Sequence, residues 1–468
     1  MLSKWGLTIE IPLLLTYFTF FMDAGIILNL NLYLTCYTLK EYPEQNCSRL
    51  GRYKDNATKH LEELVQPEAA YVTTITEMVP AALPVFVSLM IGSWSDKHGR
   101  KPVMVYVLTC LSISCGVGAI LINFCKNPYL LMLGAIPAMA CGGGMTFFSV
   151  TLAYINEIST PSNISIRMAI FEVISVFSTC FGTLASIPLL YATSYSTVYV
   201  ISCSLIFSSA VYTYFLVSEP LKNISDEKRS FSNVFTCDNF KEIFMVPFKR
   251  RPHNKRSLIL LLLLITVLLN MVMSGEKTVQ TLYLMKVFKW TSQEVNVFSS
   301  WSCVVFVIGT VVFTFLLNKK LHIKESYLTV VGIVSLIVSS ILYGIAKNNW
   351  FIYLSVPVTI LRSLINPMLR TLLGKNIARE EMGKIFSLIY VLNTFLQLGG
   401  GLMYNNIYQH TQSHPEAFNW VSIGLYAFCI LLVIVVIVLE SGIPEETSQT
   451  ETSEVTVKEK AQVTEKIK

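Results

Sequence analysis

The segment Gly92–Lys101, whose sequence is GSWSDKHGRK, is a short charged turn between two long apolar stretches of the chain. Glycines at its first and eighth positions allow two helix ends to approach each other closely. Asp96 can cap a helix N-terminus or pair with Arg100 across the turn. Charges placed at the end of an apolar stretch indicate a fixed joint between two membrane helices, although basic residues that only hold a helix end on the cytoplasmic side give a similar pattern.

The composition of the chain is that of a polytopic membrane protein. It has 468 residues, of which 53% are hydrophobic and only 14% are charged, too apolar a composition for a soluble protein. The 11 cysteines are spread mostly through apolar stretches without metal-ligand spacing, so we expect packing cysteines and no metal site. The formal charge of +6 comes from basic residues beside the apolar stretches, which argues against a nucleic-acid partner.

Apolar segments of about 20 residues, the length that a helix needs to cross a bilayer, recur along the chain. They predict an all-α membrane protein with twelve transmembrane helices in two six-helix bundles. The predicted spans are Ile9–Leu34, Tyr71–Ser93, Pro102–Phe124, Tyr129–Asn156, Met168–Leu190 and Ser196–Val217 in the first bundle, and Ser257–Leu282, Val295–Leu317, Ser326–Ala346, Trp350–Leu373, Ile385–Tyr404 and Trp420–Leu439 in the second.

These spans divide the chain into four parts. Residues 1–218 form the N-terminal bundle with an outer loop at 35–70, and residues 219–256 form a cytoplasmic linker whose last part lies along the membrane surface. Residues 257–440 form the C-terminal bundle, and residues 441–468 form a disordered cytoplasmic tail.

The basic residues set the predicted topology. With both termini in the cytoplasm, the basic clusters fall on the cytoplasmic side: Lys97 with Arg100 and Lys101, Lys249 to Arg251 with Lys255 and Arg256, Lys319 with Lys320, and Lys375. The same orientation exposes Asn46 and Asn56, which begin glycosylation acceptor triplets, on the outer side. Cys36 and Cys47 bracket part of the outer loop and could form a disulfide there.

Charged side chains inside the spans are the candidates for mechanism, because each charge in lipid needs a partner, a cavity or water. They are Asp23, Glu77, Glu172, Glu276, Lys277 and Arg362. Glu172 is the best proton site, since a poorly solvated carboxylate takes up and releases protons near neutral pH; a buried glutamate bound by a neutral hydroxyl is the alternative. Arg362 lies near the middle of its span and can hold an anion bidentately, or it can pair with an acid such as Asp23.

Other residues have candidate roles that are less specific. Asp23 and Glu276 are candidate substrate or ion contacts or structural charges, and Lys277 is a possible partner for Asp23 or Glu77. Asn393 and Gln397 share one helix face and are candidate substrate contacts. Glycines at 142–144 and 399–401, together with Pro80 and Pro84, should bend or thin their helices, or only allow close helix packing.

The six-plus-six arrangement and the turn together resemble the major facilitator superfamily. Gly92, Asp96, Gly99, Arg100 and Lys101 match that family's motif G-x-x-x-D-x-x-G-R-K. Within the superfamily, the chain is similar to the solute carrier 46 group, whose members include proton-coupled folate carriers. The matching stretches are Glu157–Thr160, Arg167–Glu172, Thr281–Tyr283, Arg370–Lys375 and Glu381–Ser387.

This resemblance implies roles for several residues. It places the proton-coupling glutamate at Glu172 and the helix 10 arginine at Arg370, for which snorkelling to the inner interface is the alternative. The family's acid shortly after helix 4, a second candidate for proton coupling, falls on Glu157. The sequence departs from the group at Met273, where the folate carriers have a histidine, and at Lys289, where they have the outer-loop cysteine.

We therefore predict a secondary active transporter that moves a small organic anion with protons by alternating access, with neither an enzymatic activity nor a cofactor. Folates, steroid or bile acid conjugates and peptidoglycan fragments are the candidate substrates, and a receptor that senses its ligand without moving it is the alternative class. The expected membrane is the plasma membrane, or else an endolysosomal membrane. We expect the residues Gly92, Asp96, Gly99, Arg100 and Lys101 to act as a conformational latch.

Overall fold

The computed structural model describes residues 9–48, 50, 56–160, 163–220, 243–252, 254–290, 292–321, 323–378, 381–411 and 413–441. Most of the predicted linker and all of the predicted tail beyond Ser441 lie outside these ranges. Within them the chain is helical, and it contains no strand.

The first half of the chain folds into one bundle. Its elements are α1 (Glu10–Leu34), the π-helical turn η2 (Thr35–Leu39), α2 (Glu44–Cys47), α3 (Asn56–His98), α4 (Arg100–Phe124), α5 (Pro128–Leu131), the 3-10 turn η3 (Met132–Ala135), α6 (Ile136–Ala140), α7 (Gly143–Ile158), α8 (Ile164–Ala192) and α9 (Tyr195–Leu216). Polar linkers separate these apolar helices at the ends, where main-chain groups can reach water.

The second half folds into a second bundle. Its elements are the 3-10 turn η5 (Val246–Phe248), α11 (Lys255–Val287), α12 (Ser292–Phe313), the π-helical turn η6 (Thr314–Lys320), α13 (Glu325–Ile345), α14 (Asn349–Val358), the 3-10 turn η7 (Thr359–Leu364), α15 (Ile365–Asn376), α16 (Met382–His410) and α17 (Ala417–Ser441).

The helices confirm the predicted all-α membrane class. Eleven helical segments of the described residues are long and apolar enough to cross a membrane. The predicted second span lies in α3, which brings the spans to approximately the twelve that were predicted. Helix α3 begins at Asn56, however, so about half of the predicted outer loop at 35–70 is helical rather than a loop.

Two predicted spans contain the interruptions that their sequences suggest. In the fourth span the α-helix stops at Ala140 and resumes at Gly143, because Gly142 and Gly143 have positive φ angles of 75° and 60°. In the tenth span, α14 with its internal Pro357 gives way to the 3-10 turn η7. Helix α16 continues through glycines 399–401, where Gly400 packs directly against the backbone of Met271, in keeping with the predicted alternative of close helix packing.

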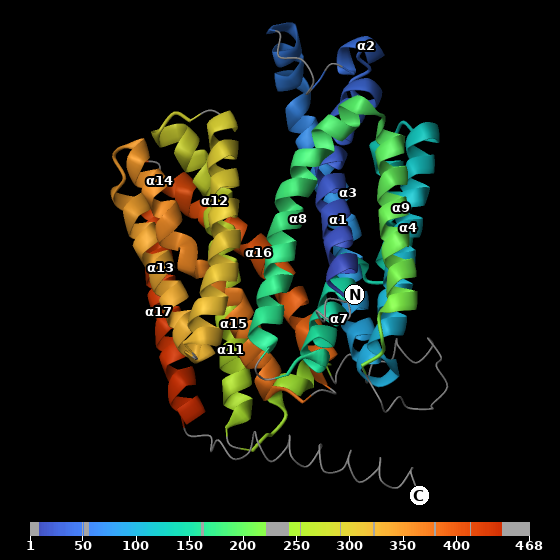
Figure 1. The fold of residues 1–468 in the computed structure, drawn as a ribbon. Helices are drawn as coiled ribbons and strands as arrows, with labels where there is room; N and C mark the ends of the chain where they lie inside the picture. Colours follow the sequence, from blue (N-terminus) through green and yellow to red (C-terminus); the bar gives the residue numbers. More distant parts are fainter. Residues whose placement is uncertain are drawn as a thin grey trace, which may run out of the picture.

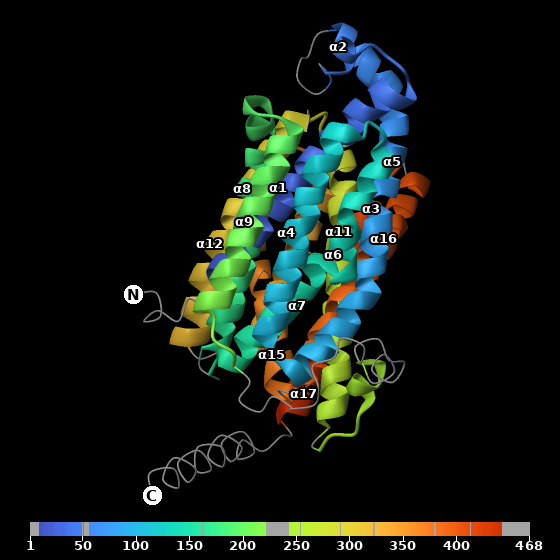
Figure 2. The same ribbon diagram turned by 90° about the vertical axis from the view of Figure 1, so that its right-hand side faces the viewer.

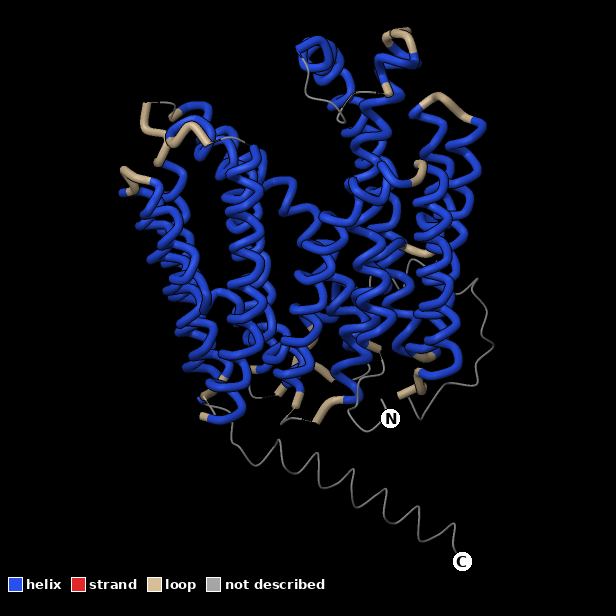
Figure 3. The backbone as a smooth tube through the Cα atoms, turned by 45° about the horizontal axis from the view of Figure 1, so that its top comes forward, coloured by secondary structure: helices blue, strands red, loops and turns tan. Residues whose placement is uncertain are grey.

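The two bundles stand side by side, and the helices of both run roughly parallel to one long axis (Figure 1; Figure 2). We call the end of the molecule that holds Gly92–Lys101 the turn end, and the end that holds α2 the loop end. Helix α1 begins and α17 finishes at the turn end (Figure 1). The ribbons of the two bundles lie closer together at the turn end and diverge toward the loop end (Figure 1; Figure 3).

The contacts between the bundles gather toward the turn end. The closest approach is between α3 and α16, where an added Cβ on Gly92 would lie 1.9 Å from the Ser387 hydroxyl oxygen and one on Gly383 would lie 2.5 Å from the Gly92 carbonyl oxygen. Beside this crossing, the hydroxyl groups of Ser149 and Ser387 are 3.2 Å apart. Glycines at both positions therefore allow the two backbones to touch.

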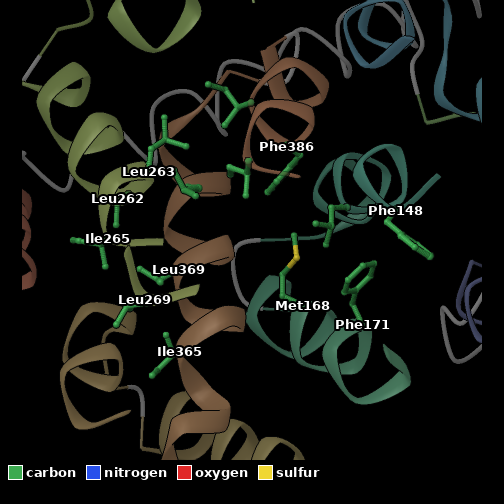
Figure 4. Close-up of a cluster of buried hydrophobic side chains, with 14 of the residues drawn as sticks. Phe148, Met168, Phe171, Leu262, Leu263, Ile265, Leu269, Ile365, Leu369 and Phe386 are labelled. Carbon is green, nitrogen blue, oxygen red and sulfur yellow. The ribbon is translucent and has the colours of Figure 1, made fainter. Parts of the chain in front are cut away.

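One apolar cluster continues from bundle to bundle and surrounds these contacts. Figure 4 shows Phe148, Met168 and Phe171 from the first bundle facing the α15 and α16 side of the second, which adds Ile365, Leu369 and Phe386. Leu262 and Leu269 of α11 extend the same cluster through the second bundle (Figure 4). The buried polar groups described below are thus set in an apolar surrounding, which strengthens their electrostatic interactions.

The loop end has a small core of its own. Cys36 and Cys47 form a disulfide with 5.7 Å between their Cα atoms, as their spacing allowed. Both pack against Val65 and Ala69 of α3, which accounts for the early start of that helix. Asn46 is exposed at this end, and the side chain of Asn56 lies outside the described residues.

Candidate functional site

An ion pair between the two bundles forms the centre of the candidate site. The Arg370 guanidinium on α15 donates through Nη1 to Glu172 Oε2 on α8 at 2.6 Å, and the Asn366 amide donates to Glu172 Oε1 at 3.1 Å. The side chains of Glu172 and Arg370 are 11% and 19% exposed. Glu172 therefore has a cationic partner, and neither the neutral hydroxyl partner nor the snorkelling of Arg370 that the sequence left open is found.

Aromatic side chains enclose this pair. The Arg370 guanidinium lies 5.1 Å from the centre of the Phe171 ring, a distance that suits a cation–π contact. Tyr17 of α1 and Tyr390 of α16 are close enough to interact electrostatically with the same guanidinium. The Tyr390 hydroxyl is buried and has no hydrogen-bond partner among the described residues. A buried hydroxyl without a well-aligned partner is costly, and the Tyr17 hydroxyl is close enough to interact with this one.

A second cluster joins the bundles at the turn end. Asp96 accepts hydrogen bonds from the main-chain N–H groups of Gly383 at 2.8 Å and Lys384 at 3.2 Å, which belong to the first turn of α16. Asp96 is also 2.5 Å from Nη2 of Arg100. The structure thus shows both arrangements that the sequence suggested for Asp96, and the helix that it caps belongs to the opposite bundle.

Arg100 is fully buried at the centre of this cluster. It donates to Glu157 through Nη2 at 2.7 Å and Nε at 3.0 Å, and to the Ser95 hydroxyl through Nη1 at 2.6 Å. Glu157 therefore lies in the cluster around Arg100 at the turn end, and its carboxylate is bound to Arg100 rather than to any group of the Glu172 pair. The proton-coupling role that the resemblance implies for Glu157 stays a prediction.

The other residues for which a latch role is predicted shape the turn itself. Gly99 has a φ angle of 107°, and an added Cβ there would lie 2.8 Å from Glu219. Glu219 accepts from the main-chain N–H groups of Arg100 at 3.0 Å and Lys101 at 2.8 Å, so it caps the N-terminus of α4. The Lys101 ammonium lies over the ring of Tyr214 at 5.7 Å.

The second bundle contains a separate polar cluster around Glu276 of α11. The Tyr426 hydroxyl donates to its Oε2 at 2.8 Å and the Ser340 hydroxyl to its Oε1 at 3.3 Å. Arg362 on η7 is near enough for its charge to act on Glu276, but the two form no ion pair. The Arg362 guanidinium lies 5.5 Å from the centre of the Phe306 ring and has no hydrogen-bonded or ionic partner among the described residues.

The remaining predicted residues are dispersed. Asp23 lies within the first bundle, where Ser202 of α9 donates to it at 2.6 Å and the Cys115 sulfur is 3.9 Å away, and it pairs with neither Arg362 nor Lys277. Asn393 accepts from the Asn270 amide at 3.4 Å, whereas Gln397 is exposed. The side chain of Glu77 lies outside the described residues.

Sequence reasoning missed several residues that make these contacts. Asn366 lies one helical turn before Arg370 and carries no charge, so it gave no signal. Glu219 follows the sixth span directly, but nothing local showed which helix it would cap. Glu381 lies in one of the stretches that resemble the solute carrier 46 group, without a signal of its own, yet it binds Lys249 Nζ at 2.7 Å and Arg251 Nη2 at 2.6 Å.

Solved structures of membrane transporters share this fold. The human organic anion transporter MFSD10 superimposes with a TM-score of 0.70 at 14% identity, covering 91% of this chain and 98% of that one. The transporter FucP in its outward conformation gives a TM-score of 0.58 at 13% identity, with coverage of 91% and 98%. At these identities the likeness shows the fold alone.

Curated relatives are transporters of the solute carrier 46 type. A probable peptidoglycan muropeptide transporter of Drosophila melanogaster is 28% identical over 90% of this chain and 83% of its own length. The proton-coupled folate transporter of Bos taurus is 21% identical over 78% of this chain and 79% of its own. A lysosomal proton-coupled steroid conjugate and bile acid symporter of Rattus norvegicus is 25% identical, with coverage of 80% and 81%.

The sequence profile of the Major Facilitator Superfamily matches residues 13–404, which include most of both bundles, the turn and the Glu172–Arg370 pair. The two-bundle architecture, the solved structures with the same fold and the curated relatives agree with that match. The chain is therefore a membrane transporter that belongs to the Major Facilitator Superfamily.

Proposed function

We propose that this transporter couples the entry of protons to the movement of a small organic anion by alternating access. The observation that carries the proposal is the ion pair between Glu172 and Arg370, because one partner belongs to each bundle. A pair that joins the two moving parts of a carrier is a group whose charge state can control their separation.

The proposed coupling follows from charge balance at this pair. Protonation of Glu172 leaves the Arg370 guanidinium with an uncompensated positive charge, which is unfavourable in an apolar surrounding. A substrate carboxylate or other anion then replaces Glu172 as the partner of Arg370, with Asn366 and the unpaired Tyr390 hydroxyl as further contacts. Proton and anion thus bind together, and neither is favoured alone.

We propose Arg362 as a second anion-binding residue, because its guanidinium lacks a partner whereas that of Arg370 is already bound to a carboxylate. Glu276 lies within the range of its charge and is bound by neutral hydroxyl donors. Asp23, Asn393 and Gln397 are less suited to the same substrate, since Asp23 lies within the first bundle and Gln397 makes no contact with either arginine among the described residues.

We propose that the structure corresponds to a state closed at the cytoplasmic side, with the turn end in the cytoplasm. The Asp96 capping of α16 supports this assignment, since it ties the first bundle to a helix end of the second at the turn end. Opening of that side requires these hydrogen bonds to break, which is the latch role proposed for Gly92, Asp96, Gly99, Arg100 and Lys101.

The names of the relatives supply the substrate classes to test. Folates, bile acid or steroid conjugates and muropeptides are all small molecules with acidic groups, in keeping with an arginine-based site. We keep the plasma membrane as the proposed location, with an endolysosomal membrane as the alternative, and Asn46 and Asn56 as the proposed glycosylation sites.

Transport by the reconstituted chain tests this proposal. The purified protein in proteoliposomes should take up at least one of folate, a conjugated bile acid or a muropeptide, faster with an acidic exterior, and uptake should saturate and support counterflow. Glu172→Gln should lose concentrative uptake and retain exchange, because the site is held in its protonated form. Glu440→Gln is a matched control, since Glu440 binds Ser326 on the far side of the second bundle.

Two outcomes would contradict the proposal. Ligand binding without flux in the wild-type liposomes would support a receptor instead of a carrier. Uptake that remains concentrative and pH-driven in Glu172→Gln would remove the proton-coupling role of that carboxyl group.

A further inference from the structure

The segment immediately before α11 crosses the boundary between the two bundles. We call residues 243–252 the strap. Its first residue, Ile243, is completely buried against Val85 and Leu89 of α3 and Leu388 and Val391 of α16. The first bundle, the second bundle and the strap therefore share one small apolar cluster at the turn end.

Ionic contacts fix the strap to the same helix end that the latch holds. Lys249 and Arg251 both bind the Glu381 carboxylate, at 2.7 Å and 2.6 Å. Glu381 occupies the N-cap position of α16, two residues before Gly383, whose N–H group binds Asp96. The strap and the latch thus contact neighbouring residues of one helix N-terminus.

The opposite face of the strap is apolar and exposed. Phe244, Met245 and Phe248 are 41%, 57% and 52% exposed, although Val246 and Pro247 between them are buried. The side chains of Met245 and Phe248 in particular expose large apolar surfaces at this position, which is unfavourable in water.

Basic residues border the same face. Lys249, Arg250 and Arg256 are exposed, and Arg250 and Arg256 form no ion pair with any described residue. Helix α11, which is long and apolar enough to cross the membrane, begins at Lys255, directly after the strap. The exposed face is therefore continuous with a surface that lipid covers, and its positive charge complements an anionic membrane.

We propose that the exposed face of the strap binds the headgroups of anionic phospholipids in the leaflet around the turn end. Phe244, Met245 and Phe248 enter the boundary between headgroups and acyl chains, while Arg250 and Arg256 bind lipid phosphates. This binding holds the strap in its seat between α3 and α16, and so supports the closed turn end. The proposal is independent of the transported substrate and of proton coupling.

Proteolysis of the full chain in lipid nanodiscs tests the proposal without a known substrate. Chymotrypsin cleaves after Phe244 and Phe248, and mass spectrometry resolves these products from others. In discs that contain phosphatidylserine beside phosphatidylcholine, cleavage of the strap should be at least fivefold slower than in discs of phosphatidylcholine alone, since each basic side chain near an anionic surface changes binding by about fivefold. Salt at 0.5 M should largely remove the difference.

Charge-removing variants locate the effect. Arg250→Gln/Arg256→Gln should reduce the dependence on phosphatidylserine to less than twofold. Lys319→Gln/Lys320→Gln is the matched control, because it removes the same charge from the end of η6 and should keep the full dependence. The salt titration of the unaltered chain stands even if a variant folds poorly.

Several results would overturn the proposal. These are equal cleavage of the strap in the two kinds of disc, a dependence on phosphatidylserine that survives 0.5 M salt, and a dependence that survives in Arg250→Gln/Arg256→Gln. Protection by inorganic phosphate in phosphatidylcholine discs would also overturn it, because that result indicates a site for a soluble anion.

Discussion

Arg362 and Arg370 belong to the same span but differ in their surroundings. Arg370 is neutralised by Glu172 of the other bundle, and its charge becomes available only when that carboxylate is protonated or withdrawn. Arg362 has no ionic or hydrogen-bonded partner among the described residues, and Glu276 is the acid with which its charge interacts at a distance. The acids that lie nearest to these two arginines are therefore different, so the proposed roles of the arginines can be separated by substitution.

The first prediction concerns Glu276. Glu276→Gln removes a negative charge from the neighbourhood of Arg362 while an amide oxygen still accepts from Tyr426 or Ser340. If Arg362 binds the substrate anion, the affinity of the Glu276→Gln variant for that anion at neutral pH should be roughly tenfold higher than that of the unaltered chain, equivalent to about 1.4 kcal/mol. Competition binding at pH 7.5 and 5.5 measures this change. If Glu276→Gln leaves the affinity for the anion unchanged while Arg370→Lys lowers it strongly, Arg370 alone binds the anion.

The second prediction concerns Asp96. Asp96→Asn keeps one acceptor oxygen but removes the charge that binds Arg100 and the N-terminus of α16. Loss of one partner from a buried ion pair costs about 3–5 kcal/mol, so the closed turn end should lose most of its population. Hydrogen exchange of residues 382–394 should speed up at least tenfold. Glu68→Gln, which affects an ion pair with Lys40 at the loop end, is the control. Unaltered exchange would leave Asp96 as a topology marker only.

The crossing of α3 and α16 is close because glycines without side chains occupy the contact positions. Gly92 and Gly383 face each other there, and Ser387 fills the space beside them. An element interface of this kind offers little room for adjustment, since both backbones are already in contact.

The third prediction follows from that crossing. Gly92→Ala places a Cβ within 1.9 Å of the Ser387 hydroxyl oxygen and should destabilise the closed arrangement by about 1–3 kcal/mol. The expected result is a lower melting temperature and faster exchange at the start of α16. Gly399→Ala in α16 is the matched control, because the added Cβ would have no neighbour within 4 Å. This substitution should leave the stability unchanged or raise it. Equal melting temperatures and equal exchange rates in the two variants would show that α3 and α16 can move apart at this crossing without loss of stability.

The membrane helices could be predicted from the sequence because each apolar segment is long enough to cross a bilayer. The predictions were wrong where contacts with other parts of the chain, and not hydropathy, determine where a helix begins. Helix α3 extends to Asn56 through a polar segment, since Val65 and Ala69 pack on the Cys36–Cys47 disulfide. The partner of Glu172 could not be predicted from spacing, because Arg370 lies 198 residues away and the rotation of a helix about its axis is not fixed by its composition.

At the scale of the whole molecule, the linker, the latch and the central ion pair all act on the same boundary between the bundles. Ile243 of the strap contacts both α3 and α16, Asp96 caps α16, and Glu172 holds Arg370. Opening of the turn end therefore requires three separate sets of contacts to break together, which makes the closed arrangement cooperative.

The fourth prediction concerns the pH dependence of the strap. Partial burial by itself raises the pKa of the Glu381 carboxyl, but hydrogen bonds from Lys249 and Arg251 outweigh burial and lower the pKa. Because the pKa of Glu381 is lower in the folded chain, its ionised carboxylate stabilises the fold fully at any pH above the ordinary glutamate pKa of about 4.3. This stabilisation is lost only as the pH falls through the lower pKa of the folded chain. Attachment of the strap should thus be unchanged between pH 7.5 and 5.

Chymotrypsin cleavage after Phe248 as a function of pH measures this attachment. Glu381→Gln should raise the cleavage rate equally at both pH values, because the charge is absent throughout. Detachment of the wild-type strap near pH 6 would show that another group controls it.

The capping of α16 by Asp96 has a consequence for how tolerant the chain is to sequence change. The donors are main-chain N–H groups, so at Lys384 every residue except proline supplies the N–H group that this hydrogen bond needs. A contact of this kind leaves no pair of side chains that must change together during evolution. Covariation between homologous sequences would therefore fail to detect it. A mutational scan would register it at Asp96 and at Gly383, where an added Cβ would lie 2.6 Å from Asp96 Oδ1.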